Sequence, residues 1–255
     1  MIDYAVRDNV AEILFNHPPV NTINHAFMDT FLAFLERARA DDEVRAILIA
    51  SALPGRFCAG LDLAALLRGS HGKAYEIVDK LYARLVDAQF GLGKPSIAAI
   101  SGEVRGGGIT IAISCDMIVA DVASTFGYPE INIGLLPAIH YTNLPRIIGR
   151  YRAFDLLFTG RTFSAEEAMQ LGLISRIANA GTVLEEARKV AQVLASKSPE
   201  LMRMGKAGFM AAIDDGYRQG VAGAVNLIGA VLATDDCKEG LSAFVEKRKP
   251  VWKAP

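Results

Sequence analysis

The sequence predicts an α/β protein with a largely parallel sheet, followed by a helical C-terminal region. Two nearly all-apolar segments, "VRAILIASA" and "KPSIAAISG", are typical of strands buried on both faces of a parallel sheet. Segments with a helical spacing of apolar residues alternate with such strands, and from Ile147 onward the pattern is predominantly helical. With 255 residues the chain can bury a large core, as one α/β domain or as one domain with a helical appendage.

The N-terminal half begins with two short strands in "YAVRDNVAEILFN", which turn at Asp8 and Asn9. A helical stripe of apolar residues covers residues 25–40, and the first buried strand comes next. The loop "LPGRFCAG" and a short helix in "LDLAALLRG" follow, after which residues 67–91 are mostly polar and helical. The second buried strand then leads into the three glycines of "RGGGITIAISCD" and a helical run that ends near Cys115.

The C-terminal half starts with two strand-like segments, "DMIVAD" and "STFGYPEIN". Ser164, with Glu167 three residues later, forms a capping box, and Gly172 marks the end of that helix. Further helices are expected to begin near Leu184, Pro199, Gly216 and Lys238. We therefore expect an α/β core over residues 1–195 and a C-terminal helical region over residues 196–255.

Composition and charge exclude several classes of protein. The net charge of −1, with 51% hydrophobic and 22% charged residues, is typical of a globular protein that binds no nucleic acid. The three cysteines, Cys58, Cys115 and Cys237, are far apart and odd in number, which indicates a reducing compartment. The first residues lack the apolar segment of a signal peptide, and the longest apolar stretch, residues 221–233, is too short for a bilayer. We expect a cytoplasmic protein without membrane insertion.

Several cofactor motifs are absent from the sequence. "GLGKPS" has Pro95 where a phosphate-binding loop carries serine or threonine, and "GEVRGGG" does not match the dinucleotide pattern G-x-G-x-x-G. No G-x-S-x-G nucleophile elbow occurs. The four histidines show no metal-ligand spacing, so we expect no metal site.

Two glycine turns, "CAGLDL" and "RGGG", each follow a buried strand and precede a helix. The first N–H groups of a helix are unpaired and carry partial positive charge. Two helix starts side by side would aim two backbone donors at one point, as a developing oxyanion requires, and glycine lets a ligand come close. The alternative is that these glycines only allow a helix to pack closely on a strand.

An acidic residue stands at a third turn. In "FGYPEINIG", Glu130 directly follows Pro129 in an apolar stretch bounded by glycines. Apolar surroundings raise the pKa of a carboxyl group toward neutrality, which suits a carrier of protons. The alternative for Glu130 is an ordinary glutamate on an exposed loop.

These three turns, in this order, resemble those of the crotonase superfamily, the enoyl-CoA hydratase/isomerase proteins. "NHPPVNTIN" resembles the N-terminal acyl-CoA loop of that family, "GRFCAGLDL" its first oxyanion segment and "ISGEVRGGGITIAISCDMIVAD" its second. "FGYPEINIGLLP" resembles the catalytic-glutamate turn, and "GRTFSAEEAMQLGLISRI" and "EGLSAFVEKRKPVW" resemble the C-terminal signatures. The resemblance covers almost the whole chain. It implies a crotonase-like superhelix of repeated strand–strand–helix turns with a helical C-terminal region.

The resemblance also implies roles for individual residues. Leu61 and Gly107 would donate backbone N–H groups to the thioester carbonyl, and Glu130 would be the catalytic acid/base. A homotrimer or hexamer, an acyl-CoA thioester substrate and no cofactor beyond the coenzyme A moiety of that substrate are implied as well. At the adenine pocket the resemblance places Ala59, Leu61 and Leu63. Phe244 and Lys247 match residues that reach coenzyme A, often from a neighbouring subunit. The other positions assigned to substrate binding are Val20 in the N-terminal loop, Asp62 with a structural role, Gly106 and Thr110 in the second oxyanion segment, and His140 and Tyr141.

Thr110 narrows the expected reaction. Typical hydratases of the family are said to use two glutamates, one at the position of Glu130 and one three residues beyond the middle glycine, which here is Thr110. Adding water requires that the water be held and deprotonated while a second proton is delivered, and threonine cannot act as a base near neutral pH. A single carboxylate suffices to move a double bond within a 3-enoyl-CoA. We therefore expect an enoyl-CoA isomerase.

Two departures from the family pattern keep alternatives open. "PAIHY" replaces a glycine-rich segment of the family and puts His140 and Tyr141 near the pocket. There the two side chains could carry protons and so permit hydration, hydrolysis or dehalogenation. The alternative is that they only pack at a helix start. Ala64 replaces a lysine that often binds coenzyme A phosphates. The alternatives to an isomerase are an enoyl-CoA hydratase and, in another class, a non-catalytic binding or scaffold protein.

Overall fold

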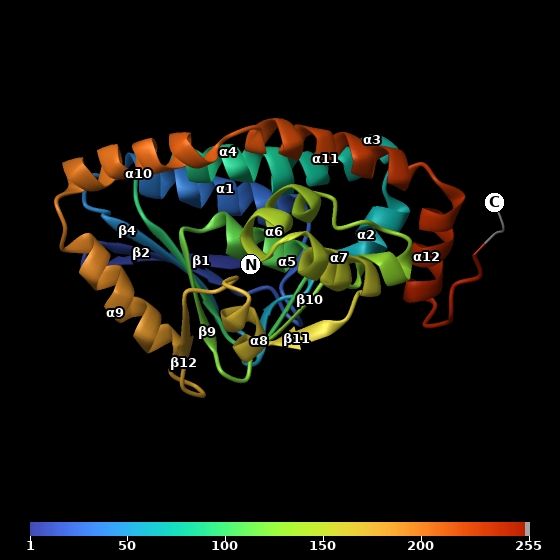
Figure 1. The fold of residues 1–255 in the computed structure, drawn as a ribbon, viewed down its shortest axis with the longest axis horizontal. Coiled ribbons are helices and arrows are strands. Elements are labelled where there is room, and N and C mark those ends of the chain that lie inside the picture. The colour runs from blue at the N-terminus through green and yellow to red at the C-terminus, as the bar shows by residue number, and fades with distance from the viewer. Residues whose placement is uncertain (253–255) are drawn as a thin grey trace.

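The protein, described here over residues 1–252 of a computed structural model, is built around a six-stranded sheet (Figure 1). Its first two strands are antiparallel and every other neighbouring pair is parallel. The predicted α/β class with a largely parallel sheet is thereby confirmed. In spatial order the strands are β1 (Ile2–Arg7), β2 (Val10–Phe15), β4 (Ala46–Ser51), β7 (Ser96–Ile100), β9 (Met117–Asp121) and β12 (Arg176–Ala178).

Two smaller sheets complete the strand framework. One has four strands in the spatial order β11 (Thr162–Ser164), β10 (Thr125–Gly127), β8 (Glu103–Arg105) and β5 (Arg56–Cys58). The other pairs β3 (Thr22–Ile23) with β6 (Gly60–Leu61) in parallel. The successive strand pairs β4–β5, β7–β8 and β9–β10 each give their first strand to the large sheet and their second to the four-stranded sheet. Helices follow each pair, so the chain advances in strand–strand–helix turns, as expected.

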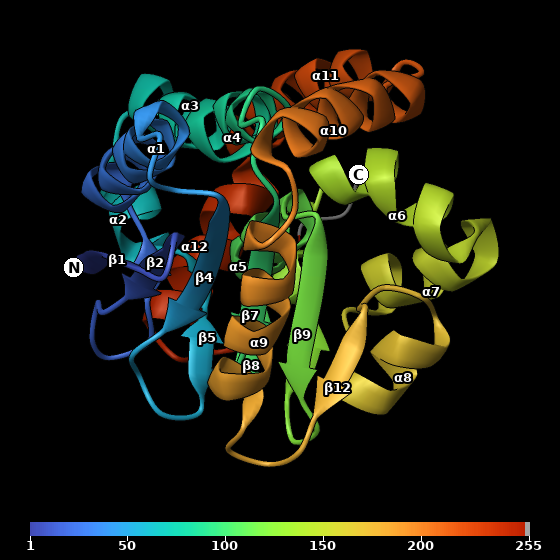
Figure 2. The ribbon, with the colours of Figure 1, turned by 90° about the vertical axis from the view of Figure 1, so that its left-hand side faces the viewer.

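Helices cover both faces of the large sheet, as Figure 2 shows, with α9 on one face and α1, α3 and α4 beyond the other. The helical elements are α1 (His25–Ala40), α2 (Leu63–Arg68), α3 (His71–Asp79), the π-helical turn η1 (Lys80–Arg84), α4 (Leu85–Phe90), α5 (Gly107–Ser114), the 3-10 turn η2 (Pro129–Ile133), α6 (Ile139–Ile148), α7 (Arg150–Thr159), α8 (Ala165–Gln170), α9 (Val183–Ala195), α10 (Pro199–Ile213), α11 (Tyr217–Leu232) and α12 (Asp235–Val245). α11 packs against α3, η1 and α6, so the C-terminal helices lie over the N-terminal half.

Side chains of the central strands enter two separate apolar cores. Successive side chains of a strand point to opposite faces, and in β4 this places Leu48 in the core beneath α9. Ile47 and Ile49 belong to the larger core on the other face. Burial on both faces explains why this strand reads as a nearly continuous apolar run.

Local sequence signals fix several element ends as predicted. Asp8 and Asn9 both adopt positive φ (48° and 62°) in the two-residue turn between β1 and β2, a conformation that asparagine and aspartate tolerate better than most residues. The hydroxyl of Ser164 accepts a hydrogen bond from the N–H of Glu167 (3.2 Å), which caps α8. Cys58 is fully buried.

Three element predictions are wrong in detail. The segment "LPGRFCAG", expected to be a loop, contains β5, which pairs with β8 in the four-stranded sheet. "STFGYPEIN" forms a strand only over β10, because Pro129 has no N–H for a sheet and instead opens the 3-10 turn η2. α12 begins at Asp235 rather than near Lys238, since Thr234 accepts a hydrogen bond from the N–H of Cys237 (3.1 Å) and caps the helix earlier. Within residues 1–252, no single helix is long and apolar enough to cross a membrane, and α11 and α12 meet that test only as a pair bent by 77°.

Candidate active site

The first glycine turn holds a backbone N–H group away from its own sheet. Gly60 adopts a positive φ of 91°, and the N–H of Asp62 donates to the carbonyl of Ile23 (2.9 Å) where β6 pairs with β3. Because N–H groups alternate in direction along a strand, the N–H of Leu61 points away from β3.

The second glycine turn is the start of α5 and abuts the first. Gly106 is the N-cap residue of α5 and has no side chain that could cap the helix. The N–H of Ile109 donates to the carbonyl of Gly106 (2.9 Å), which leaves the N–H of Gly107 available to another acceptor. A Cβ atom on Gly60 would lie 3.3 Å from the nitrogen of Gly107 and 3.1 Å from the carbonyl oxygen of Arg105. The predicted adjacency of the two helix starts is therefore present, and only glycine fits at their contact.

The three consecutive glycines each meet a different constraint. A Cβ atom on Gly106 would lie 2.5 Å from Oε1 of Glu130, and one on Gly107 would lie 3.0 Å from a methyl carbon of Leu81. One on Gly108 would lie 2.5 Å from the carbonyl oxygen of Cys58. Close packing of helix on strand thus explains Gly108, whereas Gly106 makes room for a carboxylate.

Glu130 lies in the first turn of η2 with its carboxylate against Gly106. Its Oε2 atom is buried and has no hydrogen-bond partner among residues 1–252. Burial raises the pKa of Glu130 to about 7, since an ionised carboxylate loses its hydration there. The group is therefore suited to accept and return a proton near neutral pH.

Leu61, Gly107 and Glu130 line the same small cavity. Its volume is about 20 Å³, little more than one water molecule needs. An acyl group therefore enters only when the apolar side chains around the cavity move. Those side chains come from α2, η1, the loop after η2, and α11, and include Leu66, Leu81, Leu135, Leu136, Ile228 and Leu232.

Comparison with known proteins identifies the family to which the chain belongs. A family model described as enoyl-CoA hydratase/isomerase matches residues 5–255. The chain belongs to the enoyl-CoA hydratase/isomerase family. The predicted resemblance is thus confirmed, and the chain belongs to a family of enzymes that act on acyl-CoA thioesters.

Relatives of full length support the assignment to the enoyl-CoA hydratase/isomerase family. A Thermus thermophilus protein named as an enoyl-CoA hydratase is 36% identical over 254 residues, which is 96% of this chain and 97% of the relative. Carnitinyl-CoA dehydratase of Proteus mirabilis is 32% identical over 258 residues, covering 98% of this chain and 97% of that protein.

Solved structures of the family share the fold. EchA1_1 from Mycobacterium paratuberculosis superimposes with a TM-score of 0.86 at 32% identity, covering all of this chain (100%) and 98% of its own. An enoyl-CoA hydratase from Mycobacterium avium subsp. paratuberculosis gives a TM-score of 0.88 at 25% identity, with 99% and 98% covered. The expected crotonase-type architecture is confirmed.

Thr110, which the resemblance to the family placed at the position of a second glutamate, is buried and hydrogen-bonded to a histidine. Its hydroxyl oxygen lies 3.1 Å from Nε2 of His140 on α6, and both residues are almost inaccessible to solvent. Burial lowers the pKa of His140 to about 3, and the side chain of Asn143 only partly offsets this effect. The imidazole is therefore held in its neutral form near pH 7.

The residues predicted to surround coenzyme A divide between the two ends of β6. The N–H of Ala59 donates to the carbonyl of Val20 (3.1 Å), which joins the N-terminal loop to the first oxyanion segment. The carboxylate of Asp62 accepts from the N–H of Ala65 (2.9 Å) and caps α2, in keeping with the structural role expected of it. Leu63 packs beside a small apolar cluster that joins α2 to α12.

Phe244 and Lys247 lie apart from the cavity. Phe244 on α12 is 55% exposed and Lys247 follows the helix with a φ of 55°, and neither lines the cavity of Glu130. Their predicted contact with coenzyme A stays a prediction.

Sequence reasoning missed the side chains that close the cavity. Leu81 and Tyr82 reach it from η1, a π-helical turn of the kind that often marks a functional site. Ile228 and Leu232 come from α11, far along the chain. The only local signal was the pair of leucines, Leu135 and Leu136, in "IGLLP" directly after the glutamate turn.

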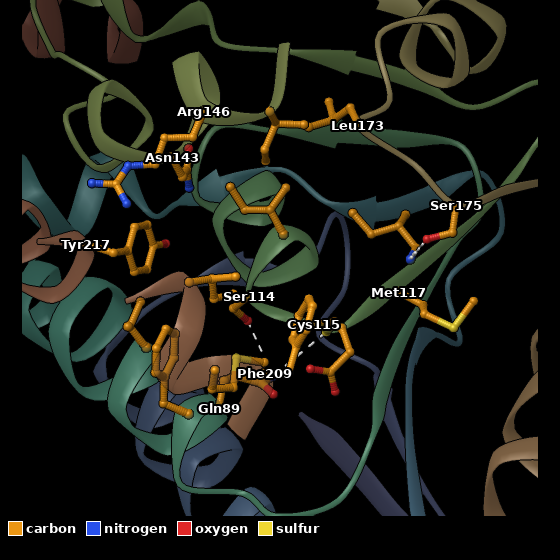
Figure 3. A pocket seen from close by; sticks show the side chains of 18 of the residues that line it. Gln89, Ser114, Cys115, Met117, Asn143, Arg146, Leu173, Ser175, Phe209 and Tyr217 are labelled. Carbon is orange, nitrogen blue, oxygen red and sulfur yellow. Dashed lines mark hydrogen bonds between the residues drawn. The ribbon is translucent and has the colours of Figure 1, made fainter. Parts of the chain in front are cut away.

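A larger cavity of about 600 Å³ lies at the other end of α5 (Figure 3). Gln89, Ser114 and Cys115 lie on one side of it, and Asn143 and Tyr217 on another. None of the predicted site residues lines this cavity. Over residues 1–252, no group of three histidine, cysteine or acidic side chains could hold a metal ion.

The raised pKa of Glu130 predicts opposite pH trends for activity and stability. Proton abstraction needs the carboxylate, so kcat/KM rises through an inflection near pH 7. At a pH between the usual carboxyl pKa and about 7, the carboxyl group of Glu130 is protonated in the folded protein and ionised in the unfolded chain. The contribution of Glu130 to the free energy of unfolding therefore falls as the pH rises through this window.

The pH prediction is checked with rate profiles and thermal unfolding of wild type and Glu130→Gln. His140 has a lowered pKa and gives the opposite slope over the acidic part of this window, so the difference between the two proteins isolates Glu130. A rate profile with its acidic inflection near pH 4 would show that the carboxyl group is hydrated rather than buried.

Proposed function

We propose that this protein is an enoyl-CoA isomerase that converts a 3-enoyl-CoA to the conjugated 2-enoyl-CoA. The observation that carries the proposal is a single carboxylate, Glu130, at a cavity that Leu61 and Gly107 also line. Where a hydratase of this family would have a second glutamate, Thr110 is hydrogen-bonded to a neutral imidazole.

In this proposal the backbone supplies the electrophile and Glu130 moves the proton. The thioester oxygen accepts hydrogen bonds from the N–H groups of Leu61 and Gly107. Glu130 takes the proton from the carbon alpha to the thioester, the electron pair delocalises over the dienolate, and the same proton returns at the gamma carbon. The oxyanion donors matter because the negative charge of the intermediate resides largely on that oxygen, and losing one such donor typically costs about 3 kcal/mol of barrier.

Coenzyme A would bind beside the first glycine turn. A groove of about 270 Å³ there has Leu61 and Asp62 on its wall and includes three basic side chains, His25, Arg68 and Lys73. These side chains can pair with phosphate groups in place of the lysine that Ala64 replaces. We propose no further cofactor, a cytoplasmic location and a homotrimer or hexamer in which Phe244 and Lys247 contact a neighbour's coenzyme A.

Hydration is the second candidate reaction. It is favoured by the names of the relatives, among them the Thermus thermophilus protein named as an enoyl-CoA hydratase. In that case Thr110 and His140 would hold the water that a second glutamate holds in a typical hydratase, and Glu130 alone would carry protons.

An ultraviolet assay with two substrates separates the candidates. An isomerase increases the conjugated-enoyl absorbance of a 3-enoyl-CoA solution and leaves a 2-enoyl-CoA intact. Loss of absorbance from the 2-enoyl-CoA would instead mean hydration. If neither substrate changes, both candidates fail for unsubstituted acyl chains.

A further inference from the structure

The side chain of Arg105 crosses from the start of α5 to strand β10. Arg105 ends β8 and directly precedes Gly106. Its Nη1 donates to the carbonyl oxygen of Thr125 on β10 (2.6 Å) and to that of Val104 (2.9 Å), and its Nη2 donates to the hydroxyl of Thr125 (2.9 Å). The aliphatic part of the side chain lies over Gly127, where a Cβ atom would be 3.4 Å from Cδ of Arg105. Two hydrogen bonds of one side chain therefore join β8 to β10.

The guanidinium of Arg105 bonds only uncharged oxygen atoms. Among residues 1–252 no carboxylate lies within ion-pair distance of it, and the carboxylate of Glu103 pairs with Arg56 instead. Burial, followed by the charge of Arg56, lowers the pKa of Arg105. Taking a guanidinium out of water without an anionic partner is unfavourable. An apolar side chain would fill the space without that penalty, so the directed hydrogen bonds are what distinguish arginine at this position.

The two strands that Arg105 joins each lead into one half of the proposed catalytic site. β8 is followed within two residues by Gly107, and β10 is followed within three residues by Glu130. The ladder between the strands is only three residue pairs long, and it ends where the N–H of Gly106 donates to the carbonyl of Gly127 (3.1 Å). The guanidinium bonds brace this short ladder back to the first residue of β10, and so limit how far its two halves can slide or separate.

We propose that Arg105 is a positioning residue that holds Glu130 at a fixed separation from the N–H of Gly107. This inference rests on the proposed function, in which Glu130 moves a proton while Gly107 binds the thioester oxygen. Arg105 does not line the cavity that these two residues share, so it acts on the reaction through β10. Proton transfer requires close contact between the reacting atoms, and a displacement of about 1 Å can lower a rate by about 100-fold.

Arg105→Met tests the proposal, because methionine keeps an unbranched side chain and has no group that donates to Thr125. We expect kcat for a 3-enoyl-CoA to fall by about 10- to 100-fold. KM should change little, because no residue of β8 or β10 lines the proposed coenzyme A groove. Arg105→Lys keeps a cation that can donate to the carbonyl of Thr125, so it should recover part of the loss. Arg56→Met is the matched control and should keep the wild-type kcat, since Arg56 lies on β5 of the same sheet and pairs with Glu103 rather than with β10.

A second variant reaches the same contact from β10. Thr125→Val keeps the shape of the side chain and the backbone carbonyl but removes the hydroxyl to which Nη2 of Arg105 donates. It should lower kcat by about 3- to 10-fold, the effect of one hydrogen bond. Adding it to Arg105→Met should cost nothing more, whereas fully additive losses would overturn the inference. If Arg105→Met does not fold, Thr125→Val decides alone, and an unchanged kcat in that variant overturns the inference.

The pH profile separates a positioning role from a purely structural one. Burial raises the pKa of Glu130, so removing the charge of Arg105 does not by itself move the inflection of kcat/KM. Water reaches a carboxylate that has left its buried position, and we therefore expect the inflection of Arg105→Met to lie below that of wild type. A lower melting temperature with the wild-type kcat and inflection would mean that Arg105 only stabilises the fold, and the inference would be wrong.

Exchange of the C2 proton of an acyl-CoA in D2O tests the proposed function separately. If wild type exchanges this proton and Arg105→Met does so at the same rate, the inference is overturned and the proposed function stands. If wild type neither exchanges the proton nor isomerises a 3-enoyl-CoA, the proposed function fails and this inference fails with it.

Discussion

Replacing Glu130 with glutamine should lower kcat by about 10²- to 10⁴-fold, the usual contribution of a positioned acid/base. The amide has nearly the same shape and still fits against Gly106, but it cannot accept the alpha proton. Acyl-CoA affinity should change little, because the proposed oxyanion donors are backbone N–H groups of Leu61 and Gly107, which the substitution leaves in place. Steady-state rates and titration calorimetry with an acyl-CoA measure the two effects separately.

The same variant separates an enzyme from a scaffold protein. An enzyme loses turnover and keeps acyl-CoA binding, whereas a scaffold would bind its partners as before and have no turnover to lose. Glu200→Gln is the matched control, since Glu200 is exposed in the first turn of α10. Full activity in Glu130→Gln would mean that another group moves the proton.

Replacing Gly106 with alanine should be almost as damaging, although alanine adds only a methyl group. The added Cβ would lie 2.5 Å from Oε1 of Glu130, and the backbone of Gly106 has a φ of 46° and a ψ of −115°. The carboxylate must move away, and a side chain in such a backbone conformation typically costs about 1–3 kcal/mol. We expect kcat to fall by about 100-fold, as catalytic groups moved by about 1 Å do, with a lower melting temperature.

Gly208→Ala is the control for the glycine prediction. Gly208 lies within α10, and no atom lies within 4 Å of its added Cβ. Alanine there should stabilise the helix by up to about 1 kcal/mol and leave kcat unchanged. If Gly106→Ala kept its turnover, the carboxylate of Glu130 could not lie in contact with Gly106 during the reaction, and the placement argued above would be wrong.

Local signals made the fold predictable, together with the fact that Leu61, Gly107 and Glu130 lie at one cavity. Burial of β4 and β7 on both faces leaves a continuous apolar run in the sequence, and Ser164 shows its cap within four residues. Leu61, Gly107 and Glu130 each belong to a short motif, and the motifs occur in the same order as in the family.

The walls of the site were not predictable because they depend on contacts between distant segments. Thr110 and His140 are 30 residues apart, and nothing near either residue signals their hydrogen bond. Ile228 and Leu232 reach the cavity from a helix whose own pattern shows only that one face is apolar. The alternation of apolar residues around Pro129 resembles that of a strand, but no strand forms there, because proline has no N–H group to donate to a sheet.

Because α11 supplies part of the cavity wall and comes late in the chain, the site is completed only near the end of synthesis. Leu61, Gly107 and Glu130 leave the ribosome long before Ile228 and Leu232, which close the cavity. Until α11 has docked, part of the apolar wall is missing and water can reach Glu130, which lowers the pKa of its carboxyl group relative to the finished protein. A nascent or truncated chain that stops ahead of α11 therefore carries Leu61, Gly107 and Glu130 but only part of the apolar wall around them, so in the proposed mechanism its hydrated carboxylate is a weaker base than in the finished protein.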